Sequence, residues 1–272
     1  MVSQNLLEKD TENILTTALT AVDEMVVVNP SRETVRKLVS SMDDLEDTPV
    51  VHVLAAERPL KDVMDDFLVA STAADLVAAD SLTLQVLEDQ PVNSLLVSAE
   101  SVISIVTAGD SVAGLTTDDS EFVDDAYSHY MDLVDSAEEF SLRTPPISQV
   151  RETLESDIGP EAATDFDAVL ASLQTARGDG DGLDEVTISL LVAAKNGELL
   201  YDISKWGEDI GLASKATFSR TKTKLEDMGL IDTEKVPIDV GRPRLRLMLG
   251  DDRLADADAD QLANVAQSIL SN

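Results

Sequence analysis

Cysteine is absent from this 272-residue sequence, and histidine occurs only twice, at His52 and His129. Without cysteine there is no disulfide framework, no thiolate metal site and no cysteine nucleophile. The sequence also lacks the glycine-rich loops of nucleotide-binding sites and the G-x-S-x-G turn of serine hydrolases. We therefore expect no enzyme, no catalytic residue, no metal site and no cofactor.

Positive charge and aromatic residues are also scarce. The chain has 20 Lys and Arg against 53 Asp and Glu, a formal net charge of −33, and aromatic residues make up 3%. The acids are spread along the whole chain, and 43% of the residues are hydrophobic, so the composition indicates a folded protein with an acidic surface. At molar salt the Debye length is about 3 Å, which screens such self-repulsion. We predict a halophilic, archaeal protein.

Long hydrophobic runs are missing as well. No stretch approaches the roughly 18 apolar residues of a membrane span. The N-terminal segment carries Glu8, Lys9 and Asp10 where a signal peptide needs an apolar run. We expect a cytoplasmic protein with no membrane partner.

Residues 1–144 alternate helix-like and strand-like patterns, which predicts an α/β domain with a mixed sheet. Leu7, Ile14 and Ala18 recur at helical spacing, and Ser31 is placed to cap a helix over 32–45. A last helix is expected over 119–139. The expected strands are 25–28, 50–54, 83–87, 94–97, 102–107 and 111–116. We interpret this part as a sensor or dimerisation domain.

Residues 145–183 are predicted to form a helical connector that ends in a Gly/Asp-rich linker. Residues 184–249 then follow the order of a winged helix-turn-helix. A first helix covers 184–195, Asp202 caps the second, and Ser214 caps a third that runs to Met228 before Gly229. Two strands complete the unit, one from Leu230 and one over 244–249. Residues 250–272 are expected to form an amphipathic helix.

The third helix has one face suited to DNA. Phe218, Thr221, Leu225 and Met228 share the core side, and small, hydroxyl and basic residues share the other. Such residues let a helix enter the major groove, where Arg and Lys contact guanine and phosphate. Lys222 lies on the inward side, with its stem expected to pack and its ammonium to reach solvent. The candidate DNA-binding residues of this helix are Ser214, Lys215, Thr217, Ser219, Arg220 and Lys224.

The loop between the two strands and the start of the second strand carry three arginines. Arg242 lies in the loop with Gly241 and Pro243, and Arg244 and Arg246 alternate with Leu245 and Leu247, so both share one strand face. A stiff basic tip of this kind suits the negative potential of a narrow minor groove. The alternative is a charged turn on an edge strand. Residues 213–249 carry eight bases and five acids, or +3, whereas residues 1–183 carry −28. An acidic protein can therefore still present a basic face to double-stranded DNA.

Residues 199–249 resemble the winged-helix domain of haloarchaeal transcription regulators of the TbsP (TrmB-suppressor) type. The most specific parts are WGEDIGLASKATFSRTK and VPIDVGRPRL, and the resemblance covers most of the chain. Segments 97–102 and 113–119 are similar to the effector domains of TrmB-type sugar-responsive regulators. The resemblance implies a DNA-binding regulator of central sugar metabolism genes, in glycolysis and gluconeogenesis. It also implies a phospholipase-D-like fold without the enzyme for the first domain.

Several residues of the first domain have two interpretations each. His52 lies in an apolar strand, which favours a hydrogen-bonded core histidine over a catalytic base, and neither histidine is followed by the lysine of a phospholipase-D site. Arg32 and Arg58 stand at strand ends, where an α/β domain holds small ligands, and could clamp an anionic metabolite. The alternative for both arginines is local ion pairing in an acidic protein.

Together these patterns predict a homodimeric transcription regulator that binds promoter DNA and responds to a small-metabolite effector. Two alternatives stay open. The winged helix could serve protein–protein contacts on a scaffold, or it could be an accessory to a metabolite-binding protein.

Overall fold

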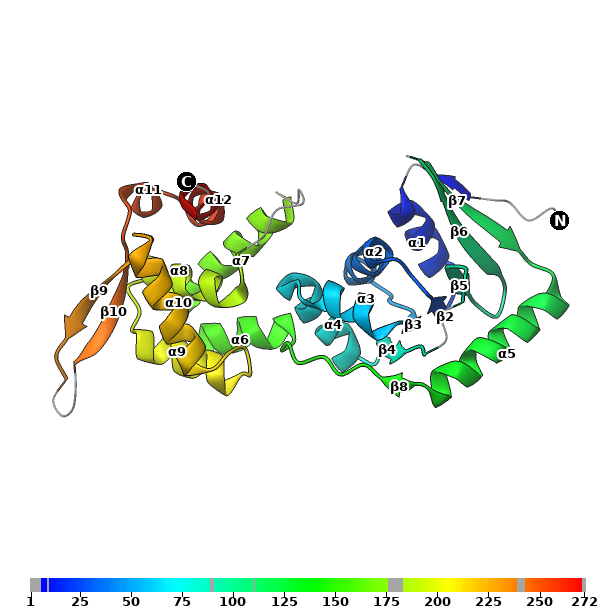
Figure 1. The fold of residues 1–272 in the computed structure, drawn as a ribbon, viewed down its shortest axis with the longest axis horizontal. Helices are drawn as coiled ribbons and strands as arrows, with labels where there is room; N and C mark the ends of the chain where they lie inside the picture. The colour runs from blue at the N-terminus through cyan, green and yellow to red at the C-terminus, as the bar shows by residue number, and fades with distance from the viewer. Residues whose placement is uncertain are drawn as a thin grey trace. The chain divides into compact units, whose positions relative to one another are not determined.

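The computed structural model of the protein describes residues 6–8, 10–88, 91–109, 111–175, 183–238 and 243–270 (Figure 1). Contacts divide the chain into two compact units, Met1–Leu142 and Arg143–Asn272. No helix in the described part of the chain is both long and apolar enough to cross a membrane.

A mixed sheet organises the first unit. Within the described residues, eight strands form it in the order β1-β7-β6-β5-β2-β3-β4-β8. β2, β3 and β4 run parallel, and the other neighbours pair antiparallel. The strands are β1 (Leu6–Glu8), β2 (Glu24–Val28), β3 (Val50–Ala55), β4 (Leu82–Val86), β5 (Leu95–Val97), β6 (Val102–Ala108), β7 (Ser111–Thr117) and β8 (Glu138–Glu139). The predicted α/β fold with a mixed sheet is confirmed.

Helices cover the two faces of this sheet unequally. α1 (Thr11–Leu19), α2 (Arg32–Asp43), α3 (Glu57–Met64) and α4 (Phe67–Ala78) share one core with it. α5 (Ser120–Ser136) packs on the other face (Figure 1). Successive strand residues point to opposite faces, so the apolar run Met25–Val28 of β2 supplies side chains to both cores.

The helix starts follow local capping chemistry. The backbone amide of Thr34 donates to Ser31 Oγ at 3.1 Å, which confirms the predicted cap of α2. The helical spacing that includes Leu7 was misleading, because Leu6–Glu8 form a strand that pairs antiparallel with β7. Helix α1 begins only at Thr11, after Asp10 accepts a hydrogen bond from the amide of Glu12 at 3.1 Å. Sheet pairing therefore overrides the helical period at this end.

His52 belongs to a polar network on the α5 face of the sheet. Its Nδ1 lies 2.8 Å from Thr83 Oγ1, and its Nε2 lies 3.2 Å from Glu24 Oε1. The Tyr127 hydroxyl of α5 donates to the second oxygen of the Glu24 carboxylate. Both ring nitrogens of His52 have partners, as expected for a core histidine. The network ties α5 to β2.

The second unit is mainly helical. Its elements are α6 (Ile147–Asp157), α7 (Pro160–Thr175), α8 (Glu185–Lys195), α9 (Leu200–Asp209), α10 (Lys215–Asp227), β9 (Ile231–Val236), β10 (Arg244–Leu249), α11 (Asp252–Ala255) and α12 (Ala259–Leu270). Every residue of α8 from Val186 to Ala194 is buried. α8 contacts α7, α9, α10, α12 and both strands, so it forms the centre of the unit.

The helices α6 and α7 pack within this second unit. α7 lies against α12 and α8, and α6 lies against α7 and α9. The indole nitrogen of Trp206 in α9 donates to Thr153 Oγ1 in α6 at 3.0 Å. The region predicted as a connector, 145–183, thus supplies two helices that support the helix-turn-helix. Its Gly/Asp-rich part, 176–182, lies outside the described residues.

Two details of the predicted helix ends are wrong. Helix α9 begins at Leu200, so Asp202 lies in its first turn and does not cap it. Met228 was placed on the core face of the third helix, but it is 42% exposed. Helix α10 ends at Asp227, and the chain turns at Gly229 with φ +74°, so Leu230 is buried there instead.

Candidate nucleic-acid interface

The helix-turn-helix is formed by α9, a short turn and α10. Gly211 has φ +79°, a backbone conformation that glycine adopts without strain. The amide of Leu212 donates to the carbonyl of Gly207 at 2.8 Å and closes the end of α9. Ser214 then caps α10, because its Oγ accepts from the amide of Thr217 at 3.2 Å. The predicted cap at Ser214 is confirmed.

A close approach between two residues fixes the crossing of the two helices. A Cβ added to Gly207 would lie 2.3 Å from Cε2 of Phe218, which is fully buried. Only glycine leaves room for the ring against the backbone of α9. The face of α10 that carries Phe218 and Leu225 is therefore held inward, as the sequence predicted, and the opposite face points to solvent.

The outward face of α10 carries the residues expected to meet DNA. Ala216, Ser219, Arg220, Thr223 and Lys224 are all exposed. The Arg220 side chain folds along the helix, where Nε donates to the carbonyl of Ala216 at 3.4 Å and Nη2 to Thr217 Oγ1 at 3.3 Å. The latter contact orients the guanidinium beside the first turn of the helix. Small and hydroxyl side chains surround it, so a groove floor can approach.

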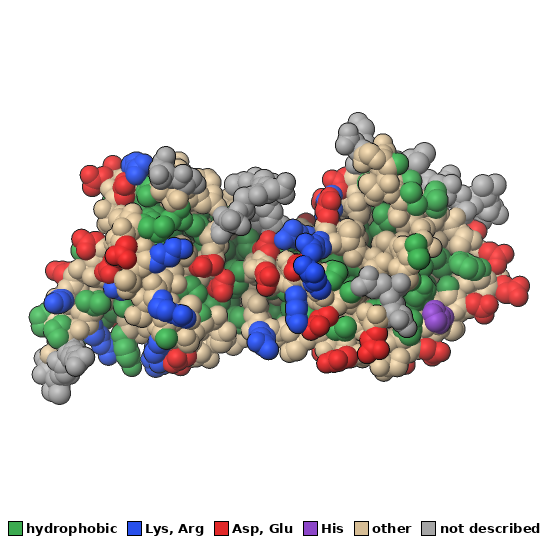
Figure 2. All heavy atoms as spheres, in the orientation of Figure 1, with side chains coloured by type: hydrophobic (Ala, Val, Ile, Leu, Met, Phe, Trp, Pro, Cys, Tyr) green, Lys and Arg blue, Asp and Glu red, His purple; other side chains and the backbone are tan. Residues whose placement is uncertain are grey.

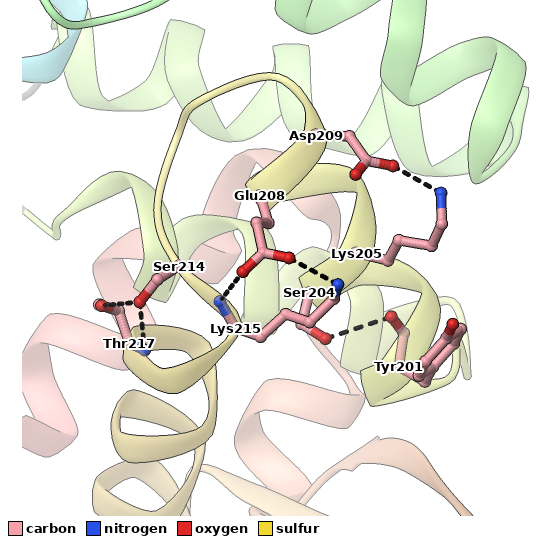
Figure 3. Close-up of polar contacts among 8 residues, drawn as sticks. All are labelled: Tyr201, Ser204, Lys205, Glu208, Asp209, Ser214, Lys215 and Thr217. Atoms are coloured by element: carbon pink, nitrogen blue, oxygen red, sulfur yellow. Dashed lines mark hydrogen bonds and ion pairs between the residues drawn. The ribbon is translucent and has the colours of Figure 1, made fainter.

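The first turn of α10 is already occupied by a carboxylate (Figure 3). Glu208 Oε2 lies 2.6 Å from Lys215 Nζ, and Glu208 Oε1 accepts from the Lys215 backbone amide at 3.3 Å. The hydrogen bond from Lys215 lowers the pKa of Glu208 and keeps it ionised. Ser214 Oγ is likewise engaged, since it lies 3.0 Å from Thr217 Oγ1. The Glu208 contact was not predicted, because Glu208 and Lys215 are seven residues apart across a turn.

Lys222 is buried, and its ammonium pairs with Glu226 Oε2 at 2.6 Å. The packed stem that the sequence predicted is confirmed, whereas the ammonium, which was expected to reach solvent, is held by Glu226. Glu226 Oε1 also accepts from Thr233 Oγ1 of β9 at 2.8 Å. Lys222 thus helps to join α10 to the hairpin.

The hairpin of β9 and β10 carries the wing arginines on one strand face. Arg244 is opposite Val236, and Arg246 is opposite Glu234. The Arg244 guanidinium carbon lies 4.2 Å from the ring centre of Tyr201, and its Nη1 lies 3.2 Å from Asp202 Oδ1. Such a stacked, ion-paired guanidinium braces the hairpin against α9. Arg242 lies outside the described residues.

Arg246 is exposed on this face. Arg246 also acts on nearby Glu198. Burial raises the pKa of Glu198, the charge of Asp202 raises it further, and the charge of Arg246 opposes this rise. On its other edge, β10 bonds to the segment before α9, because the Leu247 amide donates to the carbonyl of Glu198 at 2.8 Å. The base of the wing is therefore anchored on both edges of β10.

Acids within the unit neutralise part of its positive charge. Lys215, Lys222 and Arg244 pair with Glu208, Glu226 and Asp202 respectively. Arg220, Lys224, Lys235 and Arg246 have no ion-pair partner within 4.0 Å among the described residues. Lys235 was not among the predicted DNA-binding residues. It joins this set because it is exposed on β9. These four exposed cations can meet phosphates, although the charge of Arg246 also acts on Glu198.

The candidate ligand residues of the first unit are arranged differently. Arg32 forms an ion pair with Asp62, the local pairing that was its alternative interpretation. A cavity of about 360 Å³ lies nearby, between the start of α2 and the β6–β7 hairpin. Ser31, Thr34 and Lys37 line it, and neither Arg32 nor Arg58 does. Among the described residues, no cluster of three or more His, Asp or Glu side chains could hold a metal ion.

The three helices, the short turn and the two-stranded wing define the second unit as a winged helix-turn-helix, a class of DNA-binding domain. Two family models match the chain: "Transcriptional regulator TbsP-like, N-terminal" over residues 3–145, and "Transcriptional regulator TbsP-like, C-terminal HTH domain" over residues 146–267. The chain belongs to the family of TbsP-like transcriptional regulators. This confirms the predicted resemblance to TbsP-type regulators and identifies the chain as a transcriptional regulator with a DNA-binding helix-turn-helix domain.

Other comparisons add little. No curated protein matches the sequence. The archaeal chromatin protein TrmBL2, whose structure is described as showing a novel mode of DNA binding, is 12% identical with a TM-score of 0.37, over 51% of this chain and 55% of its own. NucT from Helicobacter pylori is 14% identical with a TM-score of 0.35, over 50% of this chain and 99% of its own. The chain spans about half the length of TrmBL2, and the family assignment rests on the family models.

Proposed function

We propose that the protein regulates transcription by binding promoter DNA through α10 and the wing. The single observation that carries this proposal is that Arg220, Lys224, Lys235 and Arg246 are exposed and outside the ion pairs that acids form with Lys215, Lys222 and Arg244 in the same unit. Lysine and arginine side chains that are not held by acids can neutralise the phosphates of DNA. Two elements present them, α10 and the β9–β10 hairpin.

In this proposal α10 enters the major groove. Arg220 and Thr217 read base edges, and Ser219 lets the helix approach closely. Lys224 contacts a phosphate further along the helix, while Ser214 and Lys215 lie at its N-terminus, where phosphates bind. The hairpin follows the adjacent minor groove with Arg242 and Arg246. Arg244 acts mainly by bracing the hairpin, given its contacts with Tyr201 and Asp202.

The proposal includes a halophilic, cytoplasmic setting. A net charge of −33 would repel DNA at low ionic strength. At molar salt the repulsion is screened within about 3 Å, and only the contacting face is felt. The contrast between −28 over residues 1–183 and +3 over residues 213–249 then favours binding through the winged helix alone.

A homodimer is part of the proposal, because two-fold dimers read paired half-sites. Its support is the part of the sheet formed by β6 and β7. On the α5 side of the sheet, Val106 and Leu115 are 42% and 48% exposed, and Phe122 of α5 is 55% exposed. The segment 102–117 carries a single charge, Asp110. Hydrophobic side chains also lie at the surface of this unit in Figure 2. Two copies of a protein with this net charge meet with least repulsion there.

The target genes and the effector complete the proposal. We assign the regulation of central sugar metabolism genes, which the sequence resemblance implies, and a small metabolite held by the first unit. The cavity beside α2 supports the second part, because hydroxyls line it together with Lys37 and its ion-pair partners Asp10 and Glu33.

Deletion of the gene, followed by transcript profiling on sugar and on gluconeogenic carbon sources, tests the function. We expect changed transcripts of sugar metabolism genes, restored by the native gene but not by an Arg220→Ala, Arg242→Ala double variant. Unchanged transcripts on every carbon source would contradict regulation. Restoration by the double variant would contradict the assigned DNA interface.

A further inference from the structure

The Glu208 carboxylate of α9, which contacts the first turn of α10, affects how DNA binding depends on salt concentration. We infer that Glu208 exchanges with a DNA phosphate on the Lys215 ammonium, and that this exchange weakens the salt dependence of DNA binding. The inference rests on the proposed function, since it concerns the same face of α10.

Glu208 occupies both donors that a phosphate would use at this corner. One oxygen lies 2.6 Å from Lys215 Nζ, and the other accepts from the Lys215 backbone amide at 3.3 Å (Figure 3). The contact therefore combines an ammonium with a backbone amide at a helix start, the two groups that favour an anion there. A phosphate that takes both donors must displace Glu208 from them.

The exchange needs no repacking of the domain. The side chains of Glu208 and Lys215 are 45% and 42% exposed, so solvent and ions reach both. The neighbouring carboxylate, Asp209, acts on Lys215 through its charge alone, and its own ion-pair partner is Lys205 on α9, at 2.5 Å. Ser214 caps α10 independently of Glu208. The helix start therefore keeps its structure when Glu208 moves away.

Counterions give the exchange its consequence. A lysine that binds a phosphate normally releases a condensed cation, and each such contact adds about −0.9 to the slope of log K against log salt. Here the displaced Glu208 carboxylate takes up a cation from solution as DNA releases one. Release and uptake offset each other, so the Lys215 contact adds little salt dependence. Affinity at low salt is lower in return, because the phosphate must displace a bound anion.

The test uses the full-length Glu208→Gln variant. Glutamine keeps the shape and the amide contact but removes the competing charge. Phosphate contacts do not depend on sequence, so the probe is a fluorescein-labelled duplex of mixed sequence, about three helical turns long. Fluorescence anisotropy is followed over a series of KCl concentrations. We expect roughly two- to fivefold tighter binding at the lowest salt, the scale of an exposed ion pair, and a slope steeper by about 0.9.

Asp209→Asn is the matched control, because it removes the same charge from the next residue of the same helix. We expect its salt slope to equal that of the native protein. A second comparison introduces Lys215→Gln into the native protein and into the Glu208→Gln variant. Loss of Lys215 should weaken binding more in Glu208→Gln than in the native protein, because only there is the ammonium unmasked. Thermal unfolding at molar KCl checks that each variant is folded.

The outcomes distinguish failure of the Glu208 exchange from failure of the proposed function. A native protein that binds the duplex, with Glu208→Gln and Asp209→Asn giving the same slope and affinity, would overturn the exchange and leave the proposed function standing. Equal effects of Lys215→Gln in both backgrounds would also overturn it. Absence of binding by every folded protein at every salt concentration would overturn the proposed function, and the exchange with it.

Discussion

The ring of Phe218 packs so closely on the backbone of Gly207 that a Cβ at Gly207 would lie 2.3 Å from the ring. This contact sets the approach of α9 to α10 and so the direction of the face that carries Arg220 and Lys224. Because the ring is fully buried, it cannot swing into solvent to make room. The geometry of the candidate interface depends on the absence of one side chain.

Gly207→Ala is therefore expected to destabilise the second unit. Overpacking a core costs roughly 1–3 kcal/mol, against a gain of about 1 kcal/mol from alanine in a helix. We expect a net loss of about 1 kcal/mol, and at most about 2 kcal/mol, in the free energy of unfolding, measured by denaturant titration at molar KCl, with weaker DNA binding. Lys205→Ala places alanine at an exposed position of the same helix and serves as the control. A Gly207→Ala protein as stable as this control would contradict the packing argument.

The stack of Arg244 on Tyr201 predicts a graded series at the wing. Tyr201→Phe keeps an aromatic ring under the guanidinium and should leave DNA affinity nearly unchanged. Tyr201→Ala and Arg244→Lys should both weaken binding, because the first removes the ring and the second replaces a planar guanidinium that stacks and pairs with Asp202. Fluorescence anisotropy with labelled duplex measures the series. Full activity of Tyr201→Ala would show that the stack does not position the wing.

The contact between Tyr127 and Glu24 predicts a dependence on pH at the alkaline end. The hydrogen bond to the Glu24 carboxylate raises the pKa of Tyr127 from its ordinary value of 10.0 to about 12. The folded state holds this proton more tightly, so the stabilisation is complete below pH 10 and is lost as the pH rises through about 12. The same hydrogen bond is the main cause that lowers the pKa of Glu24, whose contribution is present above its ordinary value of 4.5 and lost on acidification.

Spectrophotometric titration of the tyrosines at molar KCl checks this prediction. The native protein should show a late ionisation step near pH 12 that Tyr127→Phe removes. Glu24→Gln should move that step toward the ordinary range, because the carboxylate is its cause. An unchanged late step in Tyr127→Phe would assign it to another tyrosine and contradict the network.

The uncharged face of β6 and β7 predicts a variant that separates the proposed dimer. Leu115→Glu places a like charge on both copies at a face where charge is otherwise missing, so the repulsion should yield monomers. Light scattering at molar KCl measures the mass. Val92→Glu adds the same charge at a fully exposed position elsewhere and should leave the dimer intact. A Leu115→Glu protein that stays dimeric would place the interface on another surface.

The sequence was most informative where a pattern is local. The cap at Ser31, the cap at Ser214 and the alternation of the hairpin strands were all predicted, because each depends on residues a few positions apart. Leu6–Glu8 was misread as helix, because its pairing partner on β7 is about 100 residues away. The period of a short segment cannot reveal such a partner.

The candidate interface shows the same division. Arg220 and Lys224 were identified from helical spacing alone, and both lie on the exposed face. The partners that restrain its other bases were missed. Glu208 reaches Lys215 across a turn, and Asp202 and Tyr201 reach Arg244 from 42 and 43 positions away in the chain. Which partner each of these bases finds depends on how α9, α10 and the hairpin cross, and only the packed structure defines that.

Direct titration of promoter DNA with the native protein and an Arg220→Ala, Lys224→Ala double variant, both in molar KCl, tests the central claim. Loss of an arginine that reads a base costs about 1–3 kcal/mol, so we predict that the native protein binds at molar salt and that the double variant binds at least tenfold more weakly. Equal affinity of the two folded proteins would contradict the assignment of α10 as the recognition helix. Native binding that is tight only at low salt and absent at 1 M, by contrast, would contradict the account of the acidic surface.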